Sequence, residues 1–299
     1  MSDTHDPARE LTELKPEFPF FVGIDSDGCV FDSMEIKHKE CFIPNIIKYW
    51  NLQPVSKFAR ETAEFVNLYS SHRGINRWPG LVLVMDLLRE RPEVIARECA
   101  VPSLDSIRAF SQSGKPMSNN GLKAYAAEVG ENPEISRGLE WSNAVNSFVA
   151  DIVFGLPPFP FVRESLELVK ASADAVVVSA TPGDALRREW DEHEITPYVR
   201  AIAGQEFGNK SRQLQLATSD RYEPDHVLMI GDSPGDLKAA RANSSLFYPI
   251  NPGLEDASWG RFHDEAYPRF LEGRYAGEYE AALIKEFEAL LPEMPPWNR

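Results

Sequence analysis

The 299-residue sequence contains three cysteines, no long apolar run and far fewer basic than acidic residues. Cys29, Cys41 and Cys99 show no CxxC spacing and cannot all pair with one another, which argues against a disulfide framework and against a zinc site. No stretch of about 18 apolar residues could cross a bilayer, and the polar start MSDTHDPARE lacks the pattern of a signal peptide. We therefore expect a cytoplasmic protein with no membrane partner.

The shortage of positive charge limits the range of partners. The 31 Lys and Arg residues against 46 Asp and Glu residues give a formal net charge of −15 at pH 7. A surface of this sign repels polyanions, and no run of Lys or Arg offers a footprint for phosphate backbones, so nucleic acid is not an expected partner. A small phosphorylated ligand would also be repelled unless a local cation or clustered donors reversed the sign. The sequence does not indicate an oligomeric state.

Short, nearly continuous apolar segments recur along the chain and predict buried strands. They lie in PFFVGIDSDG (19–28), AVVVSA (175–180), VRAIAG (199–204), HVLMIGD (226–232) and SLFYPI (245–250). Strands without apolar/polar alternation are buried on both faces, as in a parallel sheet, and the segments between them have helical periodicity. The pattern predicts an α/β fold with a Rossmann-like, doubly wound parallel sheet.

The length favours two domains, and the strand pattern is interrupted to match. Between residues 36 and 158 helical stretches replace it, so we expect an inserted α-helical cap domain there, with GLPPFPF (155–161) as the return hinge. The sheet domain would then comprise residues 18–35 and 159–299, including two C-terminal helices. Residues 1–17 are polar and are predicted to be a flexible leader.

Four polar segments follow predicted strands, at the edge where open parallel sheets place their ligands. They are DSDGCVFDS (25–33), SATP (179–182), GNKSRQ (208–213) and GDSPGD (231–236). Together they supply acids, a lysine, a hydroxyl and backbone N–H donors at one rim of the sheet. These groups can therefore create the locally positive environment that a phosphorylated ligand needs on an acidic protein.

The acids of the first and last segments predict a metal site. Asp25 and Asp27 can both turn toward one pocket if the chain bends at Gly28. Two neighbouring carboxylates repel each other, so a bound cation would stabilise the pair. Asp232 and Asp236 add oxygen ligands at the end of another strand, which suits a hard ion such as Mg²⁺.

The two middle segments predict contacts to a phosphate group. Lys210 can offset the remaining negative charge and neutralise phosphate oxygens. Ser179 offers a hydroxyl, and the backbone N–H groups after it offer further donors to a phosphoryl oxygen.

The four segments, in this order, resemble the motifs of the haloacid dehalogenase superfamily: DxDG, a Ser or Thr after a strand, a Lys, and GDxxxD. The resemblance covers roughly residues 18–35 and 159–250, and the insertion is similar to the mobile helical cap of that family. It implies a magnesium-dependent hydrolase that acts on the phosphate ester of a small metabolite.

The resemblance also implies a role for each acid. Asp25 would attack phosphorus to give an aspartyl-phosphate, and Asp27 would protonate the leaving alkoxide and then activate water. Mg²⁺ would be held by the Asp25 carboxylate, the Asp27 main-chain carbonyl and Asp232, with Asp236 orienting this cluster or Lys210. Members of the family that cleave carbon–halogen or carbon–phosphorus bonds lack an acid at the position of Asp27, so its presence favours an oxygen-linked phosphate.

The phosphate contacts follow the resemblance with one departure. Ser179 and Lys210 would grip the phosphoryl group. At Ala180 many relatives carry an amide side chain that can reach the substrate, so the role of this position in substrate binding is open.

Other interpretations of the same residues are simpler. Asp25 and Asp27 could form a solvated turn after a strand, and the last segment could be an ordinary helix start capped by Asp232 or Ser233. Cys29, inside the first motif, is best explained as a small packing residue. For the whole chain, the alternatives to a phosphatase are a phosphomutase resembling β-phosphoglucomutase and a binding module that has lost turnover.

In the insertion, SSHRGINRWPG (70–80) interrupts two apolar helical patterns. Such a turn could bind the distal group of a substrate, because Arg suits the recognition of carboxylate or phosphate. Arg73 and Arg77 are the candidate contacts. The alternative is a charged loop between two helices.

Overall fold

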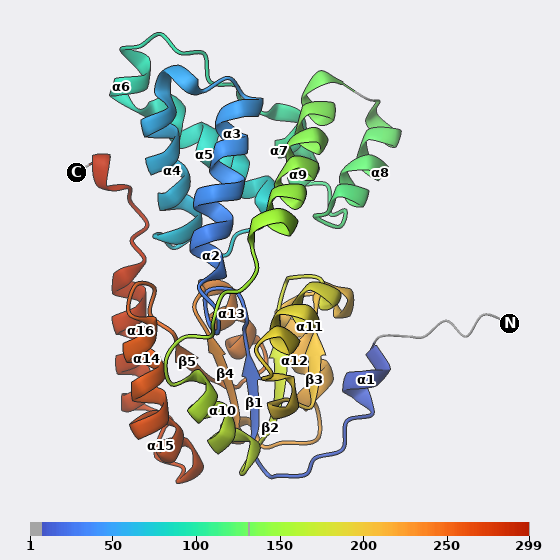
Figure 1. Cartoon of the computed structure of the whole chain (residues 1–299), viewed down its shortest axis with the longest axis vertical. Helices are drawn as coiled ribbons and strands as arrows, with labels where there is room; N and C mark the ends of the chain where they lie inside the picture. The colour runs from blue at the N-terminus through green and yellow to red at the C-terminus, as the bar shows by residue number, and fades with distance from the viewer. Residues whose placement is uncertain (1–7, 131, 299) are drawn as a thin grey trace, which may run out of the picture. The chain divides into compact units, whose positions relative to one another are not determined.

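The structure is a computed structural model, and it describes residues 8–130 and 132–298. The chain divides into two compact units (Figure 1). Unit 1 consists of Met1–Ser33 and Gly155–Leu290, and unit 2 consists of Met34–Phe154 and Leu291–Arg299. No helix in the described part of the chain has the length and apolar character that crossing a bilayer requires.

Unit 1 is built on a five-stranded sheet in which every pair of neighbouring strands is parallel. The strands are β1 (Phe21–Ile24), β2 (Asp174–Val178), β3 (Ala201–Ala203), β4 (Val227–Gly231) and β5 (Leu246–Pro249), in the order β3-β2-β1-β4-β5. All residues of β1, β2 and β4 are buried, which explains why their sequences show no alternation. The predicted α/β fold with a parallel Rossmann-like sheet is confirmed.

Helices cover both faces of the sheet. The helices of unit 1 are α1 (Ala8–Thr12), α10 (Val162–Lys170), α11 (Gly183–Glu192), α12 (Lys210–Thr218), α13 (Pro234–Ala242), α14 (Glu255–Arg261), α15 (Tyr267–Leu271) and α16 (Glu278–Leu290). On one face Ile24 packs in a cluster with residues of α10, α11 and α14. On the other face a Cβ added at Gly23 would lie 3.0 Å from the sulfur of Met229 and 3.3 Å from Leu214 of α12, so this helix approaches the sheet closely.

The strand register brings the polar segments to one edge. Ile24, the last residue of β1, is paired with Val177 of β2 and with Ile230 of β4. β2 and β4 each continue for one more residue, to Val178 and Gly231, so the three strands end within one residue of the same level. Asp25 and Asp232 lie on this edge because both of their strands run in the same direction.

Residues 8–17, expected to be part of a flexible leader, pack on unit 1. Leu11 of α1 is fully buried, and Arg221 donates to its carbonyl at 2.8 Å. The buried Asp174 accepts a hydrogen bond from the N–H group of Glu17 at 2.9 Å. Residues 1–7, the rest of the expected leader, lie outside the described residues.

All regular secondary structure in the described residues of unit 2 is helical. Its helices are α2 (Ser33–Ile36, which begins in unit 1), α3 (Ile43–Tyr49), α4 (Ser56–Leu68), α5 (Arg77–Glu90), α6 (Pro92–Ile95), α7 (Asp105–Ser111), α8 (Asn119–Val129) and α9 (Pro133–Ile152). Its core contains Trp78 of α5 and Trp141 of α9, whose ring centroids lie 5.8 Å apart in an edge-to-face arrangement.

The last residues of the chain belong to unit 2 rather than to the sheet domain, where the sequence placed them. Trp297 lies over the guanidinium of Arg91 at 4.2 Å and meets the ring of Phe65 edge to face at 5.4 Å. The N–H group of Ser71 donates to the carbonyl of Pro292 at 3.3 Å. A Pro-rich tail without helical periodicity gives no sign of these contacts in the sequence.

Candidate functional site

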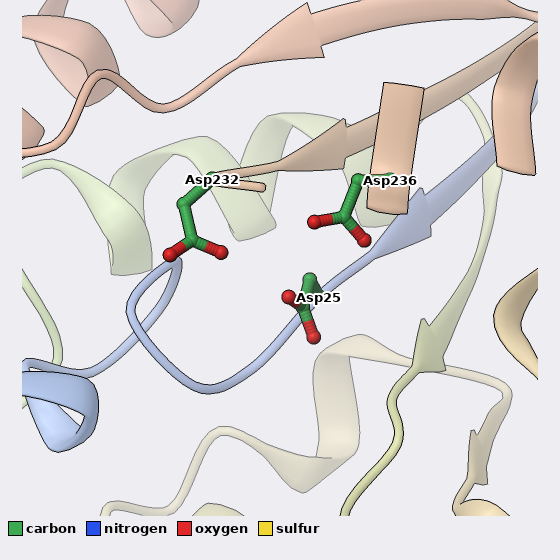
Figure 2. Close-up of side chains that lie close together, drawn as sticks. All are labelled: Asp25, Asp232 and Asp236. Atoms are coloured by element: carbon green, nitrogen blue, oxygen red, sulfur yellow. The ribbon is translucent and has the colours of Figure 1, made fainter. Parts of the chain in front are cut away.

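Three carboxylates distant in the sequence meet at the edge of the sheet (Figure 2). Asp25 follows β1, Asp232 follows β4, and Asp236 lies in the first turn of α13. One oxygen atom from each lies within 4.8 Å of the other two, and all three residues are buried. An arrangement of this kind offers an all-oxygen ligand set to a metal ion.

The start of α13 fixes the direction of the Asp236 side chain. Ser233 is the N-cap residue, and Pro234 occupies the first turn, as the sequence suggested. Oδ2 of Asp236 accepts hydrogen bonds from the N–H group of Ser233 at 3.1 Å and from its hydroxyl at 2.6 Å. Gly231 leaves the necessary space, because a Cβ atom there would lie 2.3 Å from Cγ of Asp236.

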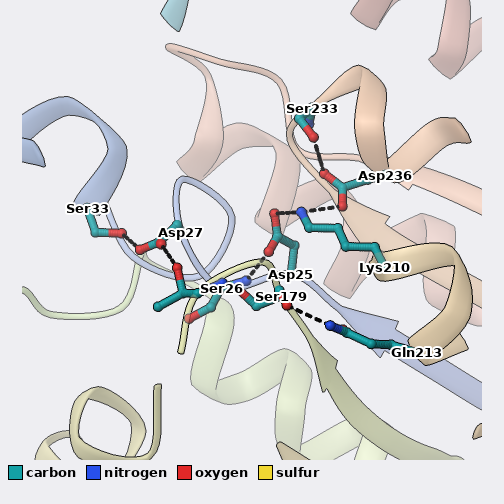
Figure 3. A network of polar contacts seen from close by, with 10 residues as sticks. Asp25, Ser26, Asp27, Ser33, Ser179, Lys210, Gln213, Ser233 and Asp236 are labelled. Carbon is teal, nitrogen blue, oxygen red and sulfur yellow. Dashed lines mark hydrogen bonds and ion pairs between the residues drawn. The ribbon is translucent and has the colours of Figure 1, made fainter. Parts of the chain in front are cut away.

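Lys210 joins two of the carboxylates (Figure 3). Its Nζ atom donates to Oδ2 of Asp25 at 2.5 Å and to Oδ1 of Asp236 at 2.6 Å. Lys210 is the first residue of α12, and Asn209 caps this helix by accepting from the N–H group of Arg212 at 2.9 Å. The lysine therefore enters the site from a defined helix terminus.

Burial and the charges of the cluster shift the pKa values of Asp25 and Lys210. Burial raises the pKa of Asp25 well above its ordinary value, and the charges of Asp236 and Asp232 raise it further, while Lys210 opposes the shift. Burial disfavours the ammonium of Lys210, but the neighbouring carboxylates outweigh this effect and raise its pKa. Three carboxylates facing one ammonium make the site favourable for an added cation.

The loop after β1 holds the carboxylate of Asp25 from its other side. Oδ1 of Asp25 accepts from the N–H group of Ser26 at 2.8 Å. The hydroxyl of Ser26 is buried and accepts from Nε1 of Trp190 at 3.0 Å. The loop turns at Gly28, which has φ of +75° and donates its N–H to the carbonyl of Phe31 at 2.8 Å. This is the bend that the sequence required for the DxDG segment.

Asp27 lies outside the carboxylate cluster. Its Oδ2 accepts from the hydroxyl of Thr181 at 2.7 Å. Its Oδ1 accepts from the hydroxyl of Ser33 (Figure 3). The sequence indicated no role for Thr181 or for Ser33. Both lie within quoted polar segments, so a hydroxyl two residues after Ser179 was the available signal for Thr181.

The second polar segment follows β2, which lies beside β1 in the sheet. Ser179 is buried, and its hydroxyl accepts from the N–H group of Thr181 at 3.2 Å. Its carbonyl accepts from Nε2 of Gln213 at 2.8 Å. Ala180 is exposed and has only a methyl group to offer. Gln213 is the last residue of the GNKSRQ segment (208–213), but the sequence indicated no role for it.

Cys29 is a packing residue in the structure, as expected. It is fully buried, and its carbonyl accepts from Nε1 of Trp259 at 2.7 Å. Burial raises the pKa of its thiol well above the ordinary value, and the charge of Asp25 adds to the shift. A thiol that stays protonated is a poor nucleophile.

The two arginines expected to contact substrate have partners inside unit 2. Arg73 is buried and donates to the carbonyl of Leu68 at 2.9 Å. Arg77 donates to the hydroxyl of Ser142 at 2.7 Å and to Oδ1 of Asn146 at 2.8 Å. Burial lowers the pKa of Arg77 to about 10, which still leaves the guanidinium charged at neutral pH. Contact of either arginine with a substrate stays a prediction.

No family model matches the sequence, and none of the curated proteins matches it. The solved structures that resemble the chain include haloacid dehalogenase-like hydrolases and several proteins named as phosphatases. One is a haloacid dehalogenase-like family hydrolase from Streptococcus pneumoniae, with 15% identity over 80% of this chain and 90% of that chain and a TM-score of 0.44.

Two other structures carry different names. One is a predicted phosphoglycolate phosphatase from Haemophilus somnus, with 16% identity over 78% of this chain and 84% of that chain and a TM-score of 0.47. The other is named as a β-phosphoglucomutase and comes from Thermotoga maritima, with 15% identity over 77% of this chain and 84% of that chain and a TM-score of 0.38. Because these identities and TM-scores are low, the proposed function rests on the residues of the site and not on the similarities.

Proposed function

We propose that this chain is a magnesium-dependent phosphatase that hydrolyses a small phosphomonoester through an aspartyl-phosphate on Asp25. The observation that carries the proposal is the meeting of Asp25, Asp232 and Asp236 within 4.8 Å, with Lys210 bonded to the first and last of them. A binding module would have no physical need to bury three repelling carboxylates around one lysine.

The donor set suits Mg²⁺, because this ion prefers carboxylate and carbonyl oxygens and keeps several waters. The resemblance to the haloacid dehalogenase motifs implies Asp25, Asp232 and the main-chain carbonyl of Asp27 as the ligands. Asp236, whose two oxygens accept from Ser233 and from Lys210, would orient the lysine. When bound, the ion would neutralise charge on the transferring phosphoryl group.

Residues of the chain itself would position the nucleophile and bind the phosphoryl group. Lys210 and the N–H group of Ser26 hold the two oxygens of Asp25, so that its carboxylate has a fixed direction for attack on phosphorus. The ammonium of Lys210 and the hydroxyl of Ser179 would bind phosphoryl oxygens. These contacts supply positioning and charge neutralisation, which provide most of the rate enhancement in phosphoryl transfer.

Asp27 is the proposed general acid and base. Thr181 and Ser33 each donate to one of its oxygens, so its carboxyl group has a defined position. An acid here can protonate the alkoxide that leaves when an oxygen-linked phosphate is cleaved. The same pair of aspartates would serve a phosphomutase, which returns the phosphoryl group to a sugar instead of to water.

The test is a phosphatase assay over a panel of phosphorylated metabolites, with Mg²⁺ and with a chelator. We expect release of inorganic phosphate only with the metal. Positional isomers of a sugar phosphate would indicate the mutase. Purified protein that releases no phosphate from any ester would favour the binding module.

The variant Asp25→Asn tests whether Asp25 is the nucleophile, and Asp184→Asn is its control. The variant should fold and retain less than about one thousandth of the turnover, because an amide cannot form the aspartyl-phosphate. Asp184→Asn changes an exposed acid in the first turn of α11 and should leave the rate unchanged. Full activity of Asp25→Asn would contradict the assignment.

A further inference from the structure

We propose that Gln213 is a positioning residue for this site, whose side-chain amide holds together the loops that place Lys210 and Ser179. The inference rests on the proposed function. It concerns a residue that none of the four motifs includes as a functional position.

The amide of Gln213 contacts three separate segments of backbone. Its Nε2 atom lies 2.8 Å from the carbonyl oxygen of Ser179, 2.9 Å from that of Gly204 and 2.9 Å from that of Gly208. Ser179 follows β2, Gly204 follows β3, and Gly208 precedes α12. Gln213 itself is fully buried on α12, and Figure 3 shows its bond to Ser179.

The geometry requires an uncharged amide in one orientation. Three carbonyl oxygens surround Nε2, and only the –NH₂ group of the side chain can donate to them. The reversed orientation would place the amide oxygen against three acceptors in a buried site, which is strongly unfavourable. A hydrophobic side chain of similar length would fill the space but would leave the three carbonyls without this donor.

The contacts of Gln213 reach Lys210 by a short path. The N–H group of Gln213 donates to the carbonyl of Asn209 at 3.0 Å, and Asn209 is the N-cap of the helix that Lys210 begins. The side chain of Gln213 holds Gly208, the residue before this cap. Nζ of Lys210 must meet two carboxylates at 2.5 and 2.6 Å, so a small displacement of the helix start would break this double contact.

The same amide also fixes the other phosphate contact. Ser179 would use its hydroxyl on a phosphoryl oxygen, while its carbonyl is tied to Gln213. One side chain therefore sets the position of Ser179 relative to Lys210. Misplacement of a catalytic group by about 1 Å can cost on the order of a hundredfold in rate, so the effect should be visible in turnover.

The experiment compares Gln213→Met with Gln215→Met in the full-length enzyme. Gln215 is exposed on the same helix and serves as the matched control. With the best substrate of the metabolite panel and saturating Mg²⁺, we expect kcat of Gln213→Met to fall by about tenfold or more, with the control within about twofold of the original enzyme. An unchanged kcat in folded Gln213→Met would overturn the inference.

A double-mutant cycle separates positioning from general loss of structure. If Gln213 acts mainly through Lys210, its substitution should have little further effect once Lys210→Met has removed the ammonium. The double variant should then match Lys210→Met within about twofold. Losses that are fully additive both with Lys210→Met and with Ser179→Ala would show that Gln213 acts through neither residue, and the inference would fall.

A second variant and a second measurement cover two ways in which the assay could fail. If Gln213→Met does not fold, Gln213→Asn retains a carboxamide that is one methylene too short to reach all three carbonyls, and the same cycle applies. If the original protein shows no turnover, the proposed function fails, but binding of inorganic phosphate with Mg²⁺ by calorimetry still tests the inference. Affinity should then fall about tenfold in Gln213→Met and not in Gln215→Met, and equal affinities would refute it.

Discussion

Oδ1 of Asp236 accepts a hydrogen bond from Nζ of Lys210 at 2.6 Å, while Oδ2 of the same carboxylate is used by Ser233. Asp236 is completely buried and thus combines a structural role with an electrostatic one. This relationship separates the two acids of the GDSPGD segment. Asp236 orients the lysine, and Asp232 is the acid proposed to bind the metal ion.

Asp236→Asn should therefore destabilise the protein. An amide must point its –NH₂ group either at the ammonium of Lys210 or at the donors of Ser233, so one buried contact becomes repulsive. We expect the free energy of unfolding to fall by roughly 1–3 kcal/mol, measured by urea denaturation in chelator. Asp232→Asn is the comparison, and an equal loss of stability in both variants would contradict the division of roles.

Asp25→Asn should have the opposite effect on the metal-free protein. The pKa of Asp25 is raised on folding, so the folded state binds more protons than the unfolded state, and stability falls as pH rises through the window above the ordinary pKa of about 3.9. The neutral amide removes this loss, which we expect to outweigh the unfavourable contact of its –NH₂ group with the N–H group of Ser26. In chelator at pH 7 to 8 the variant should melt at a higher temperature than the original protein, and the difference should shrink toward pH 4.

Saturating Mg²⁺ should reverse this order, because the ion stabilises only a site that binds it. Thermal scans with and without the metal test both parts. A variant that melts lower than the original protein in chelator at pH 8 would show that the Lys210 contact outweighs the cost of burying the charge.

Gly231→Ala should damage the site through packing alone. The added Cβ would lie 2.3 Å from Cγ of Asp236, so the strand end or α13 must move. We expect a loss of about 1–3 kcal/mol in stability and a larger loss of phosphatase activity. Gly235→Ala is the control, since its Cβ would approach nothing closer than the hydroxyl of Ser233 at 3.3 Å. Equal activity of the two variants would argue against the close approach of Asp236 to β4.

Trp297→Ala should weaken unit 2 although it lies near the end of the chain. The indole covers the buried guanidinium of Arg91 and the edge of Phe65. Removing it should cost about 1–3 kcal/mol, followed as a loss of protection from hydrogen exchange in α4 and α5. Loss of protection in the strands of unit 1 instead would place the tail with the sheet.

The fold and the acids of the site were largely predictable from local patterns. Continuous apolar runs predicted all five strands because each strand is buried on both faces. Polar residues directly after those strands had to meet at one edge, since parallel strands share a direction. Ser233 and Pro234 gave a recognisable helix start because capping depends on neighbouring residues.

Contacts between distant segments were decided only by the tertiary structure. The three carbonyls around Gln213 come from three different loops, and no spacing along the chain indicates that they converge. The same holds for Thr181 on Asp27 and for Trp297 on Arg91. The sequence by itself determined the order of strands and helices and the polar residues at strand ends, because these depend on burial and on short-range hydrogen bonds. Only the packing of the elements decided which buried donor meets which acceptor.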